Sequence, residues 1–76
     1  MLLEEIGRKL ETMDKSNSFS CYVENDILYA RFKTRKNCIV EIFTPYEKQL
    51  LKSGKFTEEN LLYKLFELKQ IANFKD

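Results

Sequence analysis

A change of hydrophobic period at Phe19 restricts the fold of this 76-residue chain more than any other feature. From Phe19 to Lys33 apolar and polar side chains alternate, with one interruption at Asn25-Asp26. Alternation predicts half-buried strands, and two residues that tolerate positive φ between two such runs predict a tight hairpin. This loop places the apolar residues of the two strands opposite one another: Val23 with Leu28, Cys21 with Ala30 and Phe19 with Phe32.

A third strand requires a second turn, for which side-chain matching selects a three-residue loop, Arg35-Lys36-Asn37. This loop pairs Phe32 with Val40, Ala30 with Ile42 and Arg31 with Glu41. A two-residue loop would instead place Glu41 opposite Ala30 on the apolar face, which the cost of burying a charge disfavours. We therefore expect strands over residues 19–24, 27–34 and 38–43.

Three helices are predicted around these strands. An amphipathic pattern covers residues 2–14, and Thr44-Pro45 followed by Glu47 predicts a capped helix over residues 45–53, ended by Gly54. Thr57 predicts the N-cap of a last helix over residues 58–74, whose core side carries Leu61, Leu62, Leu65, Phe66 and Leu68. The expected fold is a single compact α+β domain over residues 1–76, in the order α-β-β-β-α-α, with helices packed on one face of a three-stranded antiparallel meander.

Composition narrows the functions open to the chain. Histidine is absent, and Cys21 and Cys38 are the only cysteines, so no metal site is expected. The two glycines form no phosphate-binding loop, and the adjacent acids Glu4-Glu5 and Glu58-Glu59 diverge on a helix. We therefore predict neither an enzyme nor a cofactor.

The residue pattern also bears on location. No run of hydrophobic residues exceeds four, far below the roughly 18 needed to cross a bilayer. Acids near Met1 do not fit a signal peptide, so we expect a cytoplasmic protein with free thiols. Residues with A/T-rich codons, such as Lys, Ile, Asn and Phe, greatly outnumber Gly, Ala, Arg and Pro, which predicts a bacterial or phage source with an A/T-rich genome.

The second face of the predicted sheet supplies the candidate binding residues. Tyr22, Tyr29 and Phe43 form a cross-strand row on it, with Arg31 and Lys33 beside them. Arg35 and Lys36 follow in the next turn, within a segment, residues 31–55, that has seven basic and two acidic residues. An exposed aromatic row with cations is typical of an interface. In the alternative, the first or last helix covers this face, and the aromatic row forms a second, smaller hydrophobic core.

These features predict a small non-enzymatic protein-interaction module that docks onto a larger host protein with an acidic patch. Its size fits an inhibitor or regulator encoded by a phage or mobile element. The alternative is a domain that binds RNA or DNA with the same residues, cations meeting phosphates and a tyrosine stacking on bases. A homodimer through the aromatic face is a third hypothesis.

Overall fold

A computed structural model describes residues 2–35 and 37–73. The elements follow in the order α1 (Leu3–Met13), β1 (Phe19–Glu24), β2 (Ile27–Phe32), β3 (Ile39–Glu41), α2 (Pro45–Lys52) and α3 (Glu58–Asn73). The predicted α+β order is confirmed, and the element ends differ from the predicted ones by no more than two residues. The predicted last residue of α3, Phe74, lies outside the described residues.

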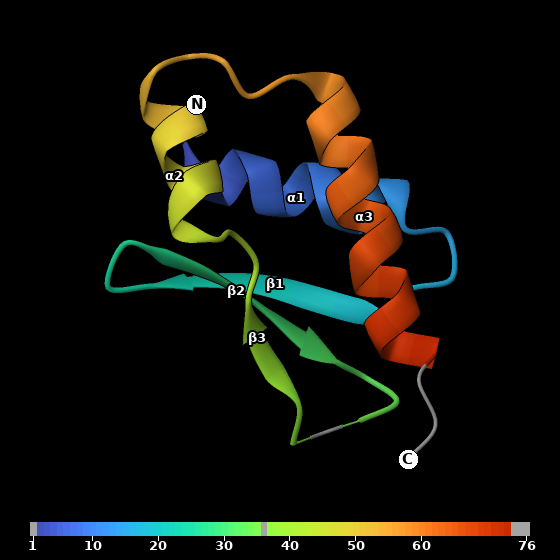
Figure 1. Ribbon diagram of the computed structural model, residues 1–76. Coiled ribbons are helices and arrows are strands. Elements are labelled where there is room, and N and C mark those ends of the chain that lie inside the picture. Colours follow the sequence, from blue (N-terminus) through green and yellow to red (C-terminus); the bar gives the residue numbers. More distant parts are fainter. Residues whose placement is uncertain (1, 36, 74–76) are drawn as a thin grey trace.

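The helices and the sheet form two layers (Figure 1). The strands are ordered β1-β2-β3, and α1, α2 and α3 all lie on one side of them, so that within the described residues no helix lies on the other side. The buried apolar side chains lie between the layers: Ile6, Leu10, Phe19, Leu28, Ala30, Phe32, Ile42, Phe43, Leu61, Leu65, Leu68 and Ala72. None of the helices in residues 2–35 and 37–73 has the length and apolarity needed to cross a bilayer.

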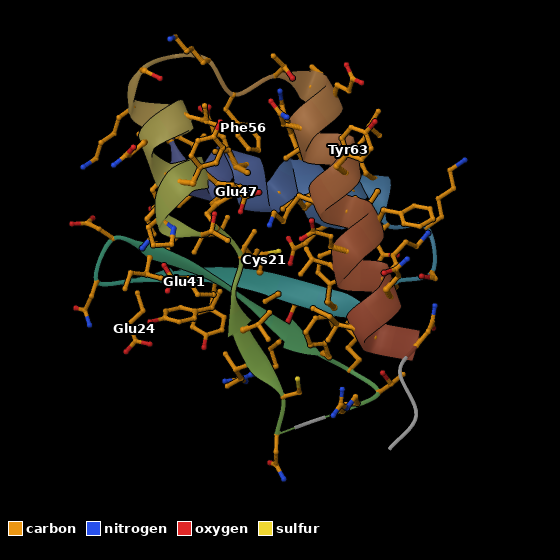
Figure 2. The ribbon with its side chains drawn as sticks, in the orientation of Figure 1. Cys21, Glu24, Glu41, Glu47, Phe56 and Tyr63 are labelled. Carbon is orange, nitrogen blue, oxygen red and sulfur yellow. The ribbon has the colours of Figure 1, made fainter. Side chains whose placement is uncertain are left out.

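Gly7 allows α1 to lie directly on the sheet. A Cβ added to Gly7 would lie 3.1 Å from Cβ of Cys21 and 3.1 Å from Cδ1 of Leu28. Both distances are shorter than ordinary van der Waals contacts, so a side chain at this position would require its neighbours to shift by a few tenths of an ångström. Figure 2 shows Cys21 in this interface, between β1 and α1.

The first hairpin follows the predicted register. Asn25 and Asp26 have φ angles of 52° and 60°, so both adopt the left-handed conformation that a two-residue turn of type I′ requires. The strands pair Phe19 with Phe32, Cys21 with Ala30, Tyr22 with Tyr29 and Val23 with Leu28, which confirms the prediction.

The second turn is longer than predicted, and the register of β3 was wrong by two residues. The structure pairs Ala30 with Val40 and Arg31 with Ile39. The N–H of Phe32 donates to the carbonyl of Cys38 at 3.3 Å, so the connection spans five residues, 33–37, instead of three. A shift of two leaves the side chains of Ile39, Val40 and Glu41 on their predicted faces, so matching by polarity alone could not distinguish the two registers.

The capping residues predicted for the two ends of α2 are confirmed. Thr44 and Glu47 form the reciprocal capping box, Pro45 occupies the first turn, and Gly54 follows the helix with φ 73°. At the start of α3 the Thr57 hydroxyl accepts a hydrogen bond from the N–H of Asn60 at 3.2 Å.

The predicted core side of α3 was partly wrong. Leu61, Leu65 and Leu68 are buried as expected, but Leu62 and Phe66 are 55% and 65% exposed. The apolar residues of this helix lie on two opposite sides, and only one of them can contact α1 and the sheet. The exposed side is therefore an unpaired surface of the folded chain.

Asp14 joins the end of α1 to the start of β1. Its buried carboxylate accepts hydrogen bonds from the hydroxyl of Ser16 at 2.6 Å and from the N–H and hydroxyl of Ser18 at 2.7 and 2.9 Å. Burial opposes ionisation, but the hydrogen bonds from both serines outweigh it and lower the pKa of Asp14 below its ordinary value of 3.8.

Candidate functional site

The sheet face opposite the helices carries a mixed set of side chains. Strand alternation places on it Ser20, Tyr22 and Glu24 from β1, Ile27, Tyr29 and Arg31 from β2, and Ile39 and Glu41 from β3. The side chain of Glu24 lies below the first hairpin, away from the helices (Figure 2). The alternative in which a helix covers this face does not hold for the described residues.

Tyr22, Tyr29 and Arg31 form one packed group on this face. The tyrosine rings are cross-strand partners and stack with centroids 5.3 Å apart and an interplanar angle of 24°. The guanidinium carbon of Arg31 lies 5.6 Å from the centroid of Tyr22, within the range of a cation–π contact. Because each ring is only half-buried, the group presents aromatic surface in a fixed arrangement.

A hollow of about 630 Å³ adjoins this group at the end of the sheet near the second turn. It is lined by Ser20, Arg31, Phe32, Lys33, Asn37 and Ile39. Ile39 is 44% exposed, and the ammonium of Lys33 donates a hydrogen bond to Oδ1 of Asn17 at 2.7 Å. We name Tyr22, Tyr29, Arg31, Lys33 and Ile39 the tyrosine–arginine face.

The structure places two of the seven predicted binding residues, Arg35 and Phe43, away from this face, and a third, Lys36, is not described. Arg35 lines a different hollow, together with Glu67, Gln70 and Ile71 of α3. Lys36 lies outside the described residues. The placement of Phe43 in the aromatic row was wrong, because Phe43 is only 3% exposed and belongs to the core.

Phe43 turns inward because β3 ends two residues before it, at Glu41. Beyond that point the strand alternation no longer applies, and the ring packs edge-on against Phe56 with centroids 5.3 Å apart. Phe56 lies between α2 and α3 (Figure 2), so this contact closes the core beneath the connection of the two helices.

A buried ion pair between α2 and α3 is the main polar feature that sequence reasoning missed. The ammonium of Lys64, which is only 5% exposed, donates to Oε1 of Glu47 at 2.8 Å and to Oε2 of Glu67 at 3.1 Å. Burial opposes ionisation of Glu47, but hydrogen bonds from Lys64 and the N–H of Thr44 lower its pKa below 4.5. Helical spacing from Leu61 and Leu68 is the signal that places Lys64 on the buried side.

Among the described side chains, the Cys21 thiol is poorly suited to act as a nucleophile. Burial, followed by the negative charges of Glu11 and Asp14, raises the pKa of the Cys21 thiol to about 12, which disfavours the nucleophilic thiolate. Within residues 2–35 and 37–73 no three His, Cys, Asp or Glu side chains are placed to hold a metal ion.

Comparison of the chain with protein-family models, with curated proteins and with solved structures finds no match.

Proposed function

We propose that the chain is a non-enzymatic interaction module that docks onto a larger protein through the tyrosine–arginine face. The stacked group of Tyr22, Tyr29 and Arg31 on the uncovered side of the sheet is the observation that carries this proposal. Tyrosine and arginine are the residue types most enriched at the centres of protein interfaces, and rings that already stack lose little freedom on binding.

The charges beside Tyr22 and Tyr29 indicate the chemistry of a partner surface that would fit this face. Arg31 and Lys33 line the same hollow, next to the exposed Ile39. A partner with an acidic side chain beside an apolar one would place its carboxylate near the two cations and its apolar group on Ile39 and the rings. An inhibitor or regulator of a larger host protein needs such a surface and no active site of its own.

Binding of RNA or DNA is the second candidate, and the two cations beside stacked rings favour it. Two further observations support protein docking instead. Tyr22 already contacts Tyr29 and the Arg31 guanidinium, so part of the ring surface that a base would use is occupied. Glu24 lies on the same sheet face and would oppose a chain of phosphates, whereas the charge of Glu41 is paired with Lys48 of α2.

The test is affinity capture from an extract of the source cells, treated with nuclease, with the immobilised chain and its Tyr22→Ala and Arg31→Glu variants. Tyr46→Ala is the matched control, because Tyr46 is 69% exposed on α2, away from the sheet face. We expect one protein to be retained by the wild type and the control and reduced about tenfold or more by both face variants.

Equal capture by all four proteins, with folding verified by circular dichroism, would contradict the proposal. Capture from an untreated extract that disappears after nuclease treatment, together with a mobility shift of oligonucleotides that weakens linearly in log salt, would establish the nucleic-acid candidate.

A further inference from the structure

The hollow of the tyrosine–arginine face, near the second turn, carries an unbalanced positive charge. Arg31 and Lys33 line it, and none of the described residues that line it is an acid. Uncharged groups hold both exposed cations: the guanidinium of Arg31 lies over the ring of Tyr22, and the ammonium of Lys33 donates to Oδ1 of Asn17. Among residues 2–35 and 37–73 no carboxylate forms an ion pair with either cation.

The acids of the same sheet face lie farther from the second turn. Glu24 is the cross-strand partner of Ile27, next to the first turn, and Glu41 is the partner of Tyr29 and forms an ion pair with Lys48 of α2. Figure 2 shows both glutamates on the side of the first hairpin. The hollow is therefore the part of this face that attracts an anion.

Hydrogen-bond donors line the hollow as well. The guanidinium of Arg31 presents several N–H groups in a planar fork, and the ammonium of Lys33 has further N–H groups beside the one that it gives to Asn17. Ser20, the cross-strand partner of Arg31, adds a hydroxyl, and Asn37 adds a side-chain amide. The lining can therefore donate to several oxygen atoms of one anion.

A phosphate monoester matches this lining better than a carboxylate does. Near pH 7 it carries a charge of about −1.5 to −2 on three acceptor oxygens, whereas a carboxylate carries a single charge on two oxygens. Two cations without acid partners match the larger charge and bind it through charge-assisted hydrogen bonds. A chain of phosphodiesters has one charge per phosphate and would extend along the face toward Glu24.

We propose that the hollow binds a phosphorylated side chain of the partner protein, with Arg31 and Lys33 holding the phosphate. This role rests on the proposed docking function and adds its regulation, because phosphorylation of the partner would strengthen docking. Ile39, which is 44% exposed beside the two cations, offers apolar surface to a residue next to the phosphorylated one.

NMR titration of the chain alone tests the site with two matched probes, the N-acetyl amides of phosphoserine and of glutamate. The phosphoserine probe should shift the backbone amides of Ser20, Arg31 and Ile39 and bind about tenfold more tightly than the glutamate probe, the effect of one further charged hydrogen bond. Arg31→Gln and Lys33→Gln should each weaken its binding by a similar factor. The control Lys55→Gln removes an exposed cation between α2 and α3 and should bind as the wild type.

Three results of the titration would overturn the proposal. One is equal affinity for the two probes, and another is binding of phosphoserine that Arg31→Gln and Lys33→Gln leave unchanged, which would show nonspecific attraction. The third is tighter binding of dimethyl phosphate or of a short oligonucleotide, which would assign the hollow to nucleic acid. The same spectra show whether each variant is folded.

Phosphatase treatment of the extract tests the regulation separately from docking itself. Retention of the partner by the wild-type chain should fall about tenfold in a phosphatase-treated extract relative to one that contains phosphatase inhibitors. Unchanged retention that still depends on Tyr22 would overturn the phosphate proposal and leave the docking function standing. Equal retention by the wild type and the Tyr22→Ala and Arg31→Glu variants would instead contradict the docking function, whatever the titration shows.

Discussion

Two aromatic pairs in the same hairpin show how differently the two faces of the sheet are used. Phe19 and Phe32 oppose each other on the face beneath the helices, with centroids 6.2 Å apart in an edge-on arrangement, and both are almost fully buried. Tyr22 and Tyr29 oppose each other on the other face, 5.3 Å apart and stacked, and are half-buried. The phenylalanine rings pack within the core, whereas the tyrosine rings contact each other and the guanidinium of Arg31 lies over Tyr22.

The two faces of the same pair of strands therefore differ in how much they contribute to the stability of the fold. Burial of an aromatic ring among α1, α3 and the sheet stabilises the fold by about 1.5–3 kcal/mol. A cross-strand pair on an open face contributes on the order of 1 kcal/mol. The tyrosine pair can therefore be changed or covered by a partner with little effect on the fold.

Phe32→Ala should have the largest effect, because it removes a fully buried ring from the core. We expect a loss of about 3–5 kcal/mol in the free energy of unfolding. A domain of this length has roughly 4–11 kcal/mol in total, so this loss should remove at least about a quarter of its stability. Urea denaturation followed by circular dichroism measures the change, and a loss below about 1 kcal/mol would show that Phe32 is less important to the core than its burial implies.

The thiol of Cys21 should be strongly protected on the covered face. With its pKa raised from 9.0 to about 12, the thiolate fraction near pH 8 falls on the order of a thousand-fold relative to an ordinary thiol. In a Cys38→Ser background, iodoacetamide should therefore label Cys21 about a thousand times more slowly in the folded chain than in urea. Similar rates in both conditions would mean that α1 opens readily from β1.

Low pH should lower the stability of the fold, because protonation of Asp14 weakens the hydrogen bonds that its carboxylate accepts between α1 and β1. Since folding lowers the pKa of this carboxyl, its contribution to stability is complete above the ordinary value of 3.8 and is lost as the pH falls through the folded pKa. Asp14→Asn should cost about 1–3 kcal/mol at pH 7 and much less near pH 2. Denaturation of both proteins at several pH values measures this, and an equal difference at all pH values would contradict it.

Tyr29→Ala should have the smallest effect on stability, about 1 kcal/mol, because its ring packs on an open face. Its effect on partner capture should exceed its effect on folding, whereas Phe32→Ala should act mainly on folding. Thermal unfolding of both variants gives the comparison directly. If Tyr29→Ala destabilised the chain as much as Phe32→Ala, the open face would be part of the structural core.

Features set by neighbouring residues could be predicted from the chain itself. The first hairpin depended on the positive φ of Asn25 and Asp26 and on an apolar pairing that only one register satisfies. The start of α2 depended on the reciprocal bonds of Thr44 and Glu47, three residues apart. These interactions are local, so no knowledge of the remaining fold was needed.

The candidate site was only partly predictable. Tyr22, Tyr29 and Arg31 come together because the first register brings them together. The register of β3 was missed because two turns that differ by two residues give the same alternation. Phe43 was misplaced because the end of β3 depends on where α2 and Phe56 pack.

By itself the sequence determined the order of the elements, the first hairpin, the start of α2 and the two faces of the sheet, because alternation, caps and turn residues act over a few positions. Only the tertiary structure decided which side of α3 is buried, how β3 pairs, and that Lys64 meets Glu47 across two helices. Each of these outcomes depends on packing between segments that are distant along the chain, where several arrangements satisfy the local pattern and the shape of the whole core selects one.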